Sequence, residues 1–291
     1  MNNHIHILSG DYFYIVEDLI TGIFKSLERL GYTVSFDLNK LHDTAINLNM
    51  GATGVSLDQF NNVKNNLIHY NLEQIIPSNY NGVNNEHLDR LKIGFVWDYS
   101  KQNIKNLKDF GIVNVEYVPI GYHESMKFIK SDPYQDIDVL FYGFETPRRT
   151  ILLEKIKNLT LNVVSSNILK YNDKPWDNSF RNNLISRSKV VLNLHAYPHN
   201  NIFEMVRVSH LLANEKAVVA EITIDTEINN NMFLAVLGGE IHELPLLCKV
   251  LVNNKELRKT QEEVGFKVFS KHRFEDYIHQ GLISYKEQYN V

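Results

Sequence analysis

Short apolar runs alternate with stretches of helical spacing along the first half of the chain. The runs HIHILSG, TVSFDL, NLIHYNLEQI, KIGFVWDYS and VEYVPIGY predict strands, and the stretch YFYIVEDLITGIFKSLERLG, which ends at Gly31, predicts a helix. Strands that are apolar along their whole length are typical of parallel sheets with helices on both faces. This half of the chain therefore predicts a doubly wound α/β domain.

The pattern restarts beyond KSDPYQDID, residues 130–138, where Pro133 and several charges indicate a linker. VLFYGF, LTLNVVSS, KVVLNLHAY and AVVAEI predict a second set of strands, and PRRTILLEKIKN, SFRNNLISRS and IFEMVRVSHLLA predict the helices between them. Residues from about 244 to 289 also have helical spacing. Two consecutive series of this kind predict an α/β fold with two doubly wound domains that face each other.

The carboxyl ends of the strands are where such domains bind their ligands. The residues that directly follow predicted strands include Asp11, Glu73, Asp98, Gly143, His195 and Glu221. A carboxylate there can act as a general base on an acceptor hydroxyl, so Asp11, Glu73 and Asp98 are catalytic candidates. The alternatives are helix caps for Asp11 and Asp98 and a buried, hydrogen-bonded Glu73.

Two arginines follow Gly143 in the stretch DVLFYGFETPRR. Glycine lets the backbone approach a ligand closely. Arg148 and Arg149 lie at a predicted helix N-terminus, which already favours phosphate, and they add positive charge there. The pattern indicates diphosphate binding, and a turn glycine followed by two solvated arginines is the alternative.

Glu204 and Arg207 are charged residues three positions apart in the apolar stretch IFEMVRVSHLLA. The apolar residues around them leave little room for a wide exposed face. A partly buried pair needs hydrogen-bond partners, and a ligand cleft can supply them. The carboxylate suits ribose hydroxyls and the guanidinium suits phosphate, whereas a local ion pair on an exposed face is the alternative.

Composition narrows the classes of protein to consider. The chain has 291 residues, 44% of them hydrophobic, and its net charge of −4 gives no broad basic surface for nucleic acid. Its single cysteine, Cys248, excludes an intrachain disulfide and fits a reducing compartment. No signal peptide or membrane-spanning apolar run is evident, so a cytoplasmic protein without a transmembrane segment is expected.

Motifs for metals and common cofactors are weak or absent. Asp136 and Asp138 precede their strand, at the wrong end of the sheet, and His4 and His6 lack a third ligand, so no metal site is expected. The P-loop, GxGxxG and GxSxG motifs do not occur in the sequence. Their absence argues against P-loop NTPases, common dehydrogenases and α/β-hydrolases.

Four stretches, taken in order, resemble GT-B-type glycosyltransferases of the CgeB-like, group-1-related bacterial and viral kind. They are NLEQI, VWDYS with VPIGY, DVLFYGFETPRR, and LNLHAY…IFEMVRVSHLLANEKAVVAE, which together span about residues 66–221. The resemblance implies two Rossmann-like domains with an inter-domain cleft. Residues 1–130 would bind the acceptor and residues 131–272 the nucleotide-sugar donor, while a helix within 273–291 would pack back on the first domain.

The resemblance also assigns roles to individual residues. Gly143 with Arg148 or Arg149 would lie beside the diphosphate, and Glu204 and Arg207 would face the nucleotide or the sugar. The remaining predicted donor-binding residues are His195, Phe203 and Glu221. Retaining members often carry a second glutamate after seven intervening residues, but this position holds Leu212, so Glu221 or a backbone group would take its role.

The implied activity is transfer of a hexosyl or pentosyl group from a nucleoside diphosphate sugar, such as a UDP-sugar, to a hydroxyl of a glycan, lipid-linked saccharide or protein. GT-B enzymes generally lack a catalytic metal, so arginines and helix dipoles would stabilise the leaving diphosphate. No cofactor besides this co-substrate is expected. The alternatives are a phage-type DNA glycosyltransferase acting on hydroxymethylated bases, for which the sequence supplies only a few lysines, and a non-catalytic nucleotide-sugar-binding protein.

Overall fold

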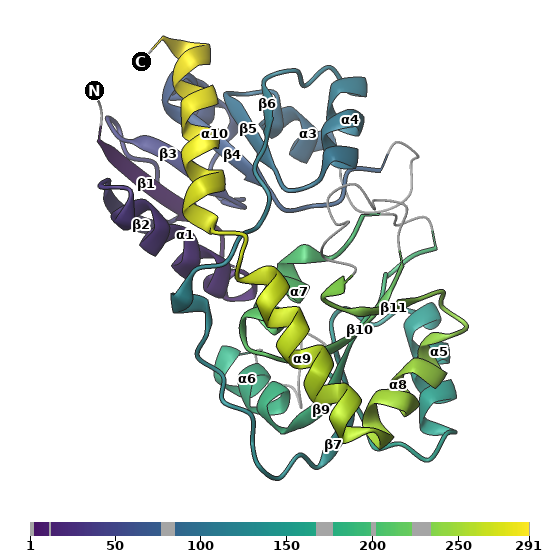
Figure 1. Cartoon of the computed structure of the whole chain (residues 1–291). Coiled ribbons are helices and arrows are strands. Elements are labelled where there is room, and N and C mark those ends of the chain that lie inside the picture. The colour runs from purple at the N-terminus through teal and green to yellow at the C-terminus, as the bar shows by residue number, and fades with distance from the viewer. Residues whose placement is uncertain are drawn as a thin grey trace. The chain divides into compact units, whose positions relative to one another are not determined.

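The computed structural model describes residues 3–11, 13–76, 85–166, 177–198, 202–222 and 234–290. The chain divides into two compact units (Figure 1): unit 1 comprises residues 1–125 and 272–291, and unit 2 comprises residues 126–271. The first division therefore falls at residue 125 where the sequence predicted 130, and the second at 271 where it predicted 272. The C-terminal helix α10 (Phe274–Tyr289) is part of unit 1.

Unit 1 is built on a parallel sheet of six strands in the order β2-β1-β3-β4-β5-β6. The strands are β1 (His4–Ser9), β2 (Thr33–Leu38), β3 (Ile46–Met50), β4 (Leu67–Asn71), β5 (Phe95–Asp98) and β6 (Val115–Tyr117). Strand β3 was not predicted, because Asn47 and Asn49 interrupt its apolar run. Both asparagines are buried and hydrogen-bonded: Asn47 Nδ2 donates to His42 O at 2.9 Å, and Asn49 Nδ2 lies 2.8 Å from His69 Nδ1.

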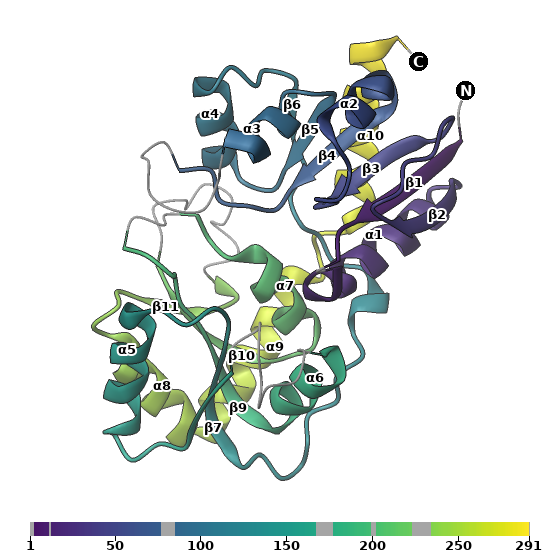
Figure 2. The ribbon, with the colours of Figure 1, turned by 180° about the vertical axis from the view of Figure 1, so that it is seen from behind.

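Helices cover both faces of this sheet. They are α1 (Glu17–Arg29), α2 (Leu57–Asn62), α3 (Asn85–Leu91), α4 (Lys101–Asp109) and α10, with short 3-10 turns at Phe13–Ile15, Lys64–Asn66 and Glu124–Met126. Side chains alternate between the faces along β5: Trp97 Nε1 donates to Gly281 O of α10 at 3.3 Å, whereas Val96 packs with Leu88 and Leu107 of α3 and α4. Accordingly, α1 and α10 pack together on one face, and α2 and α3 lie on the other (Figures 1 and 2).

Unit 2 has a parallel sheet of five strands in the order β11-β10-β9-β7-β8. The strands are β7 (Ile137–Tyr142), β8 (Val163–Ser166), β9 (Ser188–Asn193), β10 (Ala217–Glu221) and β11 (Leu237–Gly239). The helices are α5 (Pro147–Lys157), α6 (Asn178–Arg187), α7 (Met205–Ala213), α8 (Leu244–Asn253) and α9 (Lys255–Phe269). Helices α5 and α8 share a core with alternate residues of β7, β9 and β10, while α7 and α9 pack on the opposite face (Figure 1).

Two parallel sheets with helices on both faces confirm the predicted α/β class. Helix α7 begins at Met205, so the predicted start at residue 202 was wrong: Glu204 is the N-cap with a non-helical ψ of 62°. Among the described helices, none is both long enough and apolar enough to cross a membrane.

The ammonium of Lys216, just before β10, is buried, and its Nζ donates to Ser131 Oγ at 2.8 Å. Burial lowers the pKa of Lys216 to about 8. The unfolded chain, with a lysine pKa near 10.4, then binds more protons than the folded chain between pH 8 and about 10.4, so folding stability rises with pH in that window. We expect the wild type to gain about 2 kcal/mol over Lys216→Met between pH 7 and 10 in urea unfolding. If the free energy of unfolding changed equally with pH in the two proteins, this expectation would be contradicted.

Candidate functional site

The carboxyl edge of the unit 2 sheet gathers most of the residues that the sequence singled out. Gly143 follows β7, His195 follows β9, and Glu221 ends β10, while Arg148 and Arg149 lie in the first turn of α5. Because β7, β9 and β10 are neighbours in the sheet, these residues come from adjacent strand ends. This is the edge at which open α/β sheets bind their ligands.

Arg149 is a buried arginine whose guanidinium crosses this edge. Its Nε and Nη2 donate to Leu194 O at 3.2 and 2.5 Å, and its Nη1 donates to Phe144 O at 2.7 Å. Burial, and next the charge of Arg207, lower the pKa of Arg149 to about 10. The side chain therefore stays charged at neutral pH, in surroundings where an added anion would stabilise it.

Arg207, on the first turn of α7, brings a second guanidinium to the same point. Its Nη1 donates to Asn193 Oδ1 at 2.7 Å, and its guanidinium carbon lies 5.6 Å from the centre of the Tyr142 ring. A methyl group placed on Gly143 would lie 3.1 Å from Arg207 Nη2 and 3.6 Å from Arg149 Nη1. The two guanidinium groups thus converge on the glycine turn after β7, where their like charges repel.

Arg148 has different partners. It forms an ion pair with Glu221 through both η nitrogens, with Nη1 at 3.0 Å from Oε2, and the same Nη1 donates to His195 O at 3.0 Å. Glu221 Oε2 in turn accepts the backbone N–H of His195 at 3.1 Å. The Arg148–Glu221 pair is therefore neutral as a unit and joins the start of α5 to the ends of β9 and β10.

Buried polar atoms along this edge lack partners. Among the described residues, Ser166 Oγ, Asn193 Nδ2 and both ring nitrogens of His195 have no hydrogen bond, although each side chain is at most 2% exposed. Burial lowers the pKa of His195, so its neutral ring offers one donor and one acceptor. Each unpaired buried group costs about 1–3 kcal/mol. Their concentration at one edge indicates a place that a polar ligand completes.

The last two predicted donor residues flank this cluster. The Glu204 carboxylate acts to raise the pKa of both Arg149 and His195, which places its charge near both side chains. Phe203 is 1% exposed and offers no open ring face. Sequence reasoning missed Asn193 and Ser166. Each is the last residue of its strand, and a polar residue at a strand end was the signal that could have found them.

In unit 1, the catalytic candidates are dispersed. Asp98 is fully buried at the end of β5, where Asn71 Nδ2 donates to its Oδ2 at 2.6 Å and the backbone N–H of Ser100 donates to its Oδ1 at 2.8 Å. Glu73 is exposed beyond β4. Asp11 is exposed after β1 and accepts Asn39 Nδ2 at 2.9 Å. Helix α1 begins later, with Val16 as its N-cap, so the capping alternative for Asp11 was wrong.

Asn71 and His87 were not singled out from the sequence. Asn71 ends β4 beside Asp98 in the sheet register, and His87 Nε2 lies 3.0 Å from Asn71 Oδ1. Only carboxylates were predicted as chemical groups at the strand ends of this unit, so Asn71 was not included. His87 lies in α3, a helix that no apolar run in the sequence predicted.

One group among the described residues could hold a metal ion: His123, Glu124 and Glu275 in unit 1. Arg29 already bonds both carboxylates, with its Nη1 2.6 Å from Glu275 Oε1. His123 Nδ1 accepts the backbone N–H of Ser125 at 3.0 Å, which leaves the proton of the neutral ring on Nε2, the nitrogen that faces the carboxylates. A protonated nitrogen and a guanidinium suit a closed ion-pair cluster better than a metal site.

Comparison with sequences finds distant relatives. No protein-family model matches the chain. Two uncharacterized proteins of Acanthamoeba polyphaga mimivirus are similar to it: one is 26% identical over 178 residues, 60% of this chain and 55% of the relative, and the other is 30% identical over 153 residues, 53% and 49% of the two chains. The chain thus spans about half the length of these relatives.

Comparison with solved structures matches nearly the whole chain. HepE of Anabaena, solved with UDP and glucose, has a TM-score of 0.61 at 12% identity over 97% of this chain and 99% of that one. A mutant of T4 phage BGT, solved with UDP-glucose, has a TM-score of 0.60 at 14% identity over 99% and 100%. A glycosyltransferase of Rickettsia africae has a TM-score of 0.58 at 13% identity over 98% of both chains. The chain therefore has the GT-B glycosyltransferase fold.

Proposed function

We propose that the chain is a glycosyltransferase that moves a hexosyl group from a nucleoside diphosphate sugar of the UDP-glucose class to an acceptor hydroxyl. The observation that carries the proposal is the convergence of Arg149 and Arg207 on Gly143 at the carboxyl edge of the unit 2 sheet. Two guanidinium groups that face one point suit a ligand with two adjacent negative groups. The complexes of HepE and T4 phage BGT with UDP or UDP-glucose support this donor class.

In this proposal, the diphosphate lies against Arg149, Arg207 and the N-terminus of α5. Transfer breaks the bond between the anomeric carbon and the diphosphate oxygen, forms a bond to the acceptor oxygen, and releases the acceptor proton. The guanidinium groups stabilise the charge that builds on the leaving diphosphate. Because side chains can supply that charge, we propose that the reaction proceeds without a metal.

The buried polar atoms without hydrogen bonds, beside the arginines, suit the sugar and ribose parts of the donor. His195, Asn193 and Ser166 together offer donors and an acceptor for hydroxyl groups of the sugar or ribose. The Arg148–Glu221 pair bonds the backbone of His195 on both sides, so we propose that it positions this histidine and does not itself bind phosphate.

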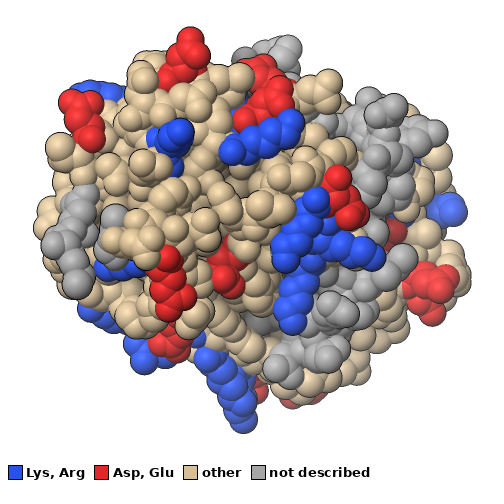
Figure 3. Space-filling view, turned by 90° about the horizontal axis from the view of Figure 1, so that it is seen from above, with Lys and Arg blue, Asp and Glu red and all other residues tan. Residues whose placement is uncertain are grey.

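For the acceptor, charge favours a saccharide or protein over duplex DNA. The net charge is −4, and among the described side chains on the face shown in Figure 3, lysines and arginines occur together with aspartates and glutamates. Binding of duplex DNA is dominated by phosphate neutralisation. A glycan or other hydroxyl acceptor is therefore the better-supported partner.

UDP and UDP-glucose are expected to raise the melting temperature, since a ligand that binds only the folded state at 100 times its Kd adds about 2.7 kcal/mol of stability. The shift should persist in EDTA. GDP- and CMP-sugars in the same panel identify the base. If no nucleoside diphosphate stabilises the protein, the proposal fails. Stabilisation by UDP-glucose without any release of UDP in a mixture of saccharide acceptors would instead support non-catalytic donor binding.

A further inference from the structure

Unit 2 contains an open cavity between α5 and the segment that joins β11 to α8 (Figure 1). Its volume is about 400 Å³, within the range of about 300–1,000 Å³ that is typical of small-molecule sites and enough for about a dozen heavy atoms. Among the described residues, its lining comprises Arg148, Ile151, Leu152, Lys155, Ile241 and His242. The imidazole of His242 lies 3.4 Å from the Glu240 carboxylate, so it already has an acidic partner.

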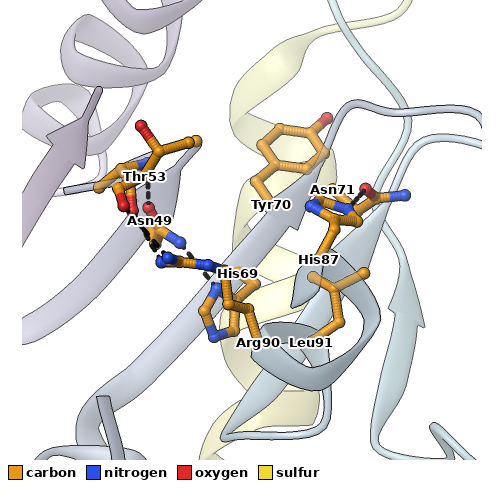
Figure 4. Close-up of a pocket in the computed structure, with 10 residues that line it drawn as sticks. Asn49, Thr53, His69, Tyr70, Asn71, His87, Arg90 and Leu91 are labelled. Atoms are coloured by element: carbon orange, nitrogen blue, oxygen red, sulfur yellow. Dashed lines mark hydrogen bonds between the residues drawn. The ribbon is translucent and has the colours of Figure 1, made fainter. Parts of the chain in front are cut away.

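A cavity in unit 1 differs from it in size and in kind (Figure 4). Its volume of about 50 Å³ holds only a few water molecules. Polar side chains of its lining bond one another: Asn49 Nδ2 lies 2.8 Å from His69 Nδ1, and on the other side His87 Nε2 lies 3.0 Å from Asn71 Oδ1. These groups hold strands and helix of unit 1 together, whereas the larger cavity of unit 2 has room for a ligand.

The unit 2 cavity has an apolar floor and one helical wall. Its four residues from α5 stand at positions 148, 151, 152 and 155, a spacing that places them on one face of the helix. Leu152 belongs to the buried core of the unit, and Ile241 packs against that core. Ile151 is 60% exposed although its side chain is aliphatic. An aliphatic ligand in the cavity would therefore bury apolar surface that the fold leaves in water.

Arg148 brings unused hydrogen-bond donors to this cavity. Its Nη1 donates to His195 O and to Glu221 Oε2, both at 3.0 Å, and its Nη2 bonds Glu221 Oε1. These bonds occupy three of the five N–H groups of a guanidinium. The Nε–H and the second Nη2–H have no acceptor among the described residues, and the side chain is 17% exposed. This edge of the guanidinium can bind one more carboxylate.

Lys155 supplies positive charge at the other end of the same helical face. It is exposed and forms no ion pair among the described residues, whereas Lys157 of the same helix pairs with Glu154 at 2.7 Å. Since Glu221 already balances the charge of Arg148, the cavity offers one available cation beside two free N–H groups. This set suits a singly charged carboxylate better than a phosphate monoester, which carries about two charges at neutral pH.

We propose that this cavity binds a small amphiphilic carboxylate that weakens donor binding. The aliphatic body lies against Ile151, Leu152 and Ile241. The carboxylate lies between Lys155 and Arg148, which are seven residues or about 10 Å apart along the helix axis, a span that their long side chains can close.

The effect on the donor site passes through Arg148. A carboxylate bound to its free edge shares the guanidinium with Glu221 and loosens that ion pair. The pair bonds the backbone of His195 on both sides, so a looser pair holds this histidine less firmly. The effect on the donor rests on the proposed glycosyltransferase activity, whereas binding in the cavity does not.

Methyl NMR of the full-length protein, labelled with carbon-13 at the isoleucine δ1 position, tests binding with octanoate as the probe. The signals of Ile151 and Ile241, assigned by their loss in the Ile→Val variants, should shift below the micelle concentration, and that of Ile137, at the start of β7, should not. Octanol, octylamine and octyl phosphate should bind about tenfold more weakly than octanoate. Shifts spread over isoleucines of both units, or octanol or octyl phosphate binding as tightly as octanoate, would overturn the inference.

Two lysines of α5 provide a matched pair of variants. Lys155→Gln should weaken octanoate binding about tenfold and remove its advantage over octanol, because the available cation is lost. Lys157→Gln removes the same charge from the same helix outside the cavity, so octanoate affinity should stay within about twofold. Equal losses in the two variants would mean that octanoate responds to the overall charge of α5 and that the cavity does not bind it.

Calorimetric titration with UDP-glucose, with and without saturating octanoate, tests the effect on the donor. Affinity for UDP-glucose should fall at least about fivefold in the wild type and in Lys157→Gln, and remain unchanged in Lys155→Gln at the same octanoate concentration. If UDP-glucose does not bind the wild type even without octanoate, the proposed function fails, and the isoleucine signals still decide whether the cavity binds a carboxylate. If octanoate shifts those signals but leaves UDP-glucose affinity unchanged, the regulatory role is wrong and the proposed function stands.

Discussion

Arg207→Ala is expected to weaken UDP binding about 100-fold, measured by isothermal titration calorimetry. Arg207 and Arg149 face the same point beside Gly143, so each guanidinium would neutralise part of the diphosphate. Truncating one member of a desolvated charge contact costs about 2–5 kcal/mol, and 100-fold corresponds to about 2.7 kcal/mol. The variant should fold, because Arg207 is only half-buried and the partner that it leaves, Asn193, is a neutral amide.

The matched control is Arg187→Ala in the same unit. Arg187 precedes β9, at the amino end of the sheet, and its exposed side chain pairs with Asp136. Its loss removes the same net charge without touching the proposed site, so UDP affinity should change less than about twofold. Similar losses in both variants would mean that overall charge, and not the convergence on Gly143, governs binding.

A strand could be predicted from the sequence when its buried residues are apolar. Strands β4, β5, β7 and β9 are covered by helices on both faces, and their apolar runs were recognisable from sequence. Strand β3 is equally buried, but it contains Asn47 and Asn49, whose side-chain amides form hydrogen bonds inside the protein. These polar residues interrupt the apolar run, so the strand was not predicted. A side chain that finds its partner in the tertiary structure carries no signal of burial in the sequence.

The same reasoning explains which residues of the candidate site could be predicted to lie at one edge of the sheet. Gly143, His195 and Glu221 were predicted because parallel strands bring their carboxyl ends to one edge, which requires only the order of the elements. The different partners of the two arginines were not predictable. Arg148 and Arg149 are adjacent in sequence, yet one pairs with Glu221 and the other bonds backbone oxygens beside Arg207. That difference depends on the direction of each side chain from the helix, together with the position of β10.

In unit 1, the sequence predicted carboxylates as catalytic candidates but did not predict Asn71, whose amide bonds both Asp98 and the backbone of Glu73. Asp98 was one of three candidates for a general base, and its oxygens accept hydrogen bonds from Asn71 and Ser100 in a fully buried position. Hydrogen bonds connect Asp98 through Asn71 to His87. This connection joins three separate elements, β5, β4 and α3, so no local spacing in the chain predicts it.

Gly121 lies where α10 joins the rest of unit 1, and its importance follows from backbone contacts alone. Tyr122 N donates to His272 O at 2.7 Å, and Phe274 N donates to Tyr122 O at 3.0 Å, so the two segments run side by side. A methyl group on Gly121 would lie 2.6 Å from Phe274 Cα, 2.7 Å from Phe274 N and 2.8 Å from His272 O. None of these atoms belongs to a side chain that could rotate away.

Gly121→Ala is therefore expected to lower the free energy of unfolding by about 3 kcal/mol, at the upper end of the usual cost of overpacking. Urea unfolding followed by circular dichroism measures this loss. Gly31→Ala is the matched control: Gly31 has a φ of +87°, but its added methyl group meets no atom within 4 Å, so only backbone strain of about 1 kcal/mol is expected. Both variants gain the same methyl group, and only Gly31→Ala carries the cost of a positive φ, so a larger loss in Gly121→Ala must come from the steric contact with residues 272–274. A smaller loss for Gly121→Ala than for Gly31→Ala would show that the segment beside α10 can shift to accommodate a side chain.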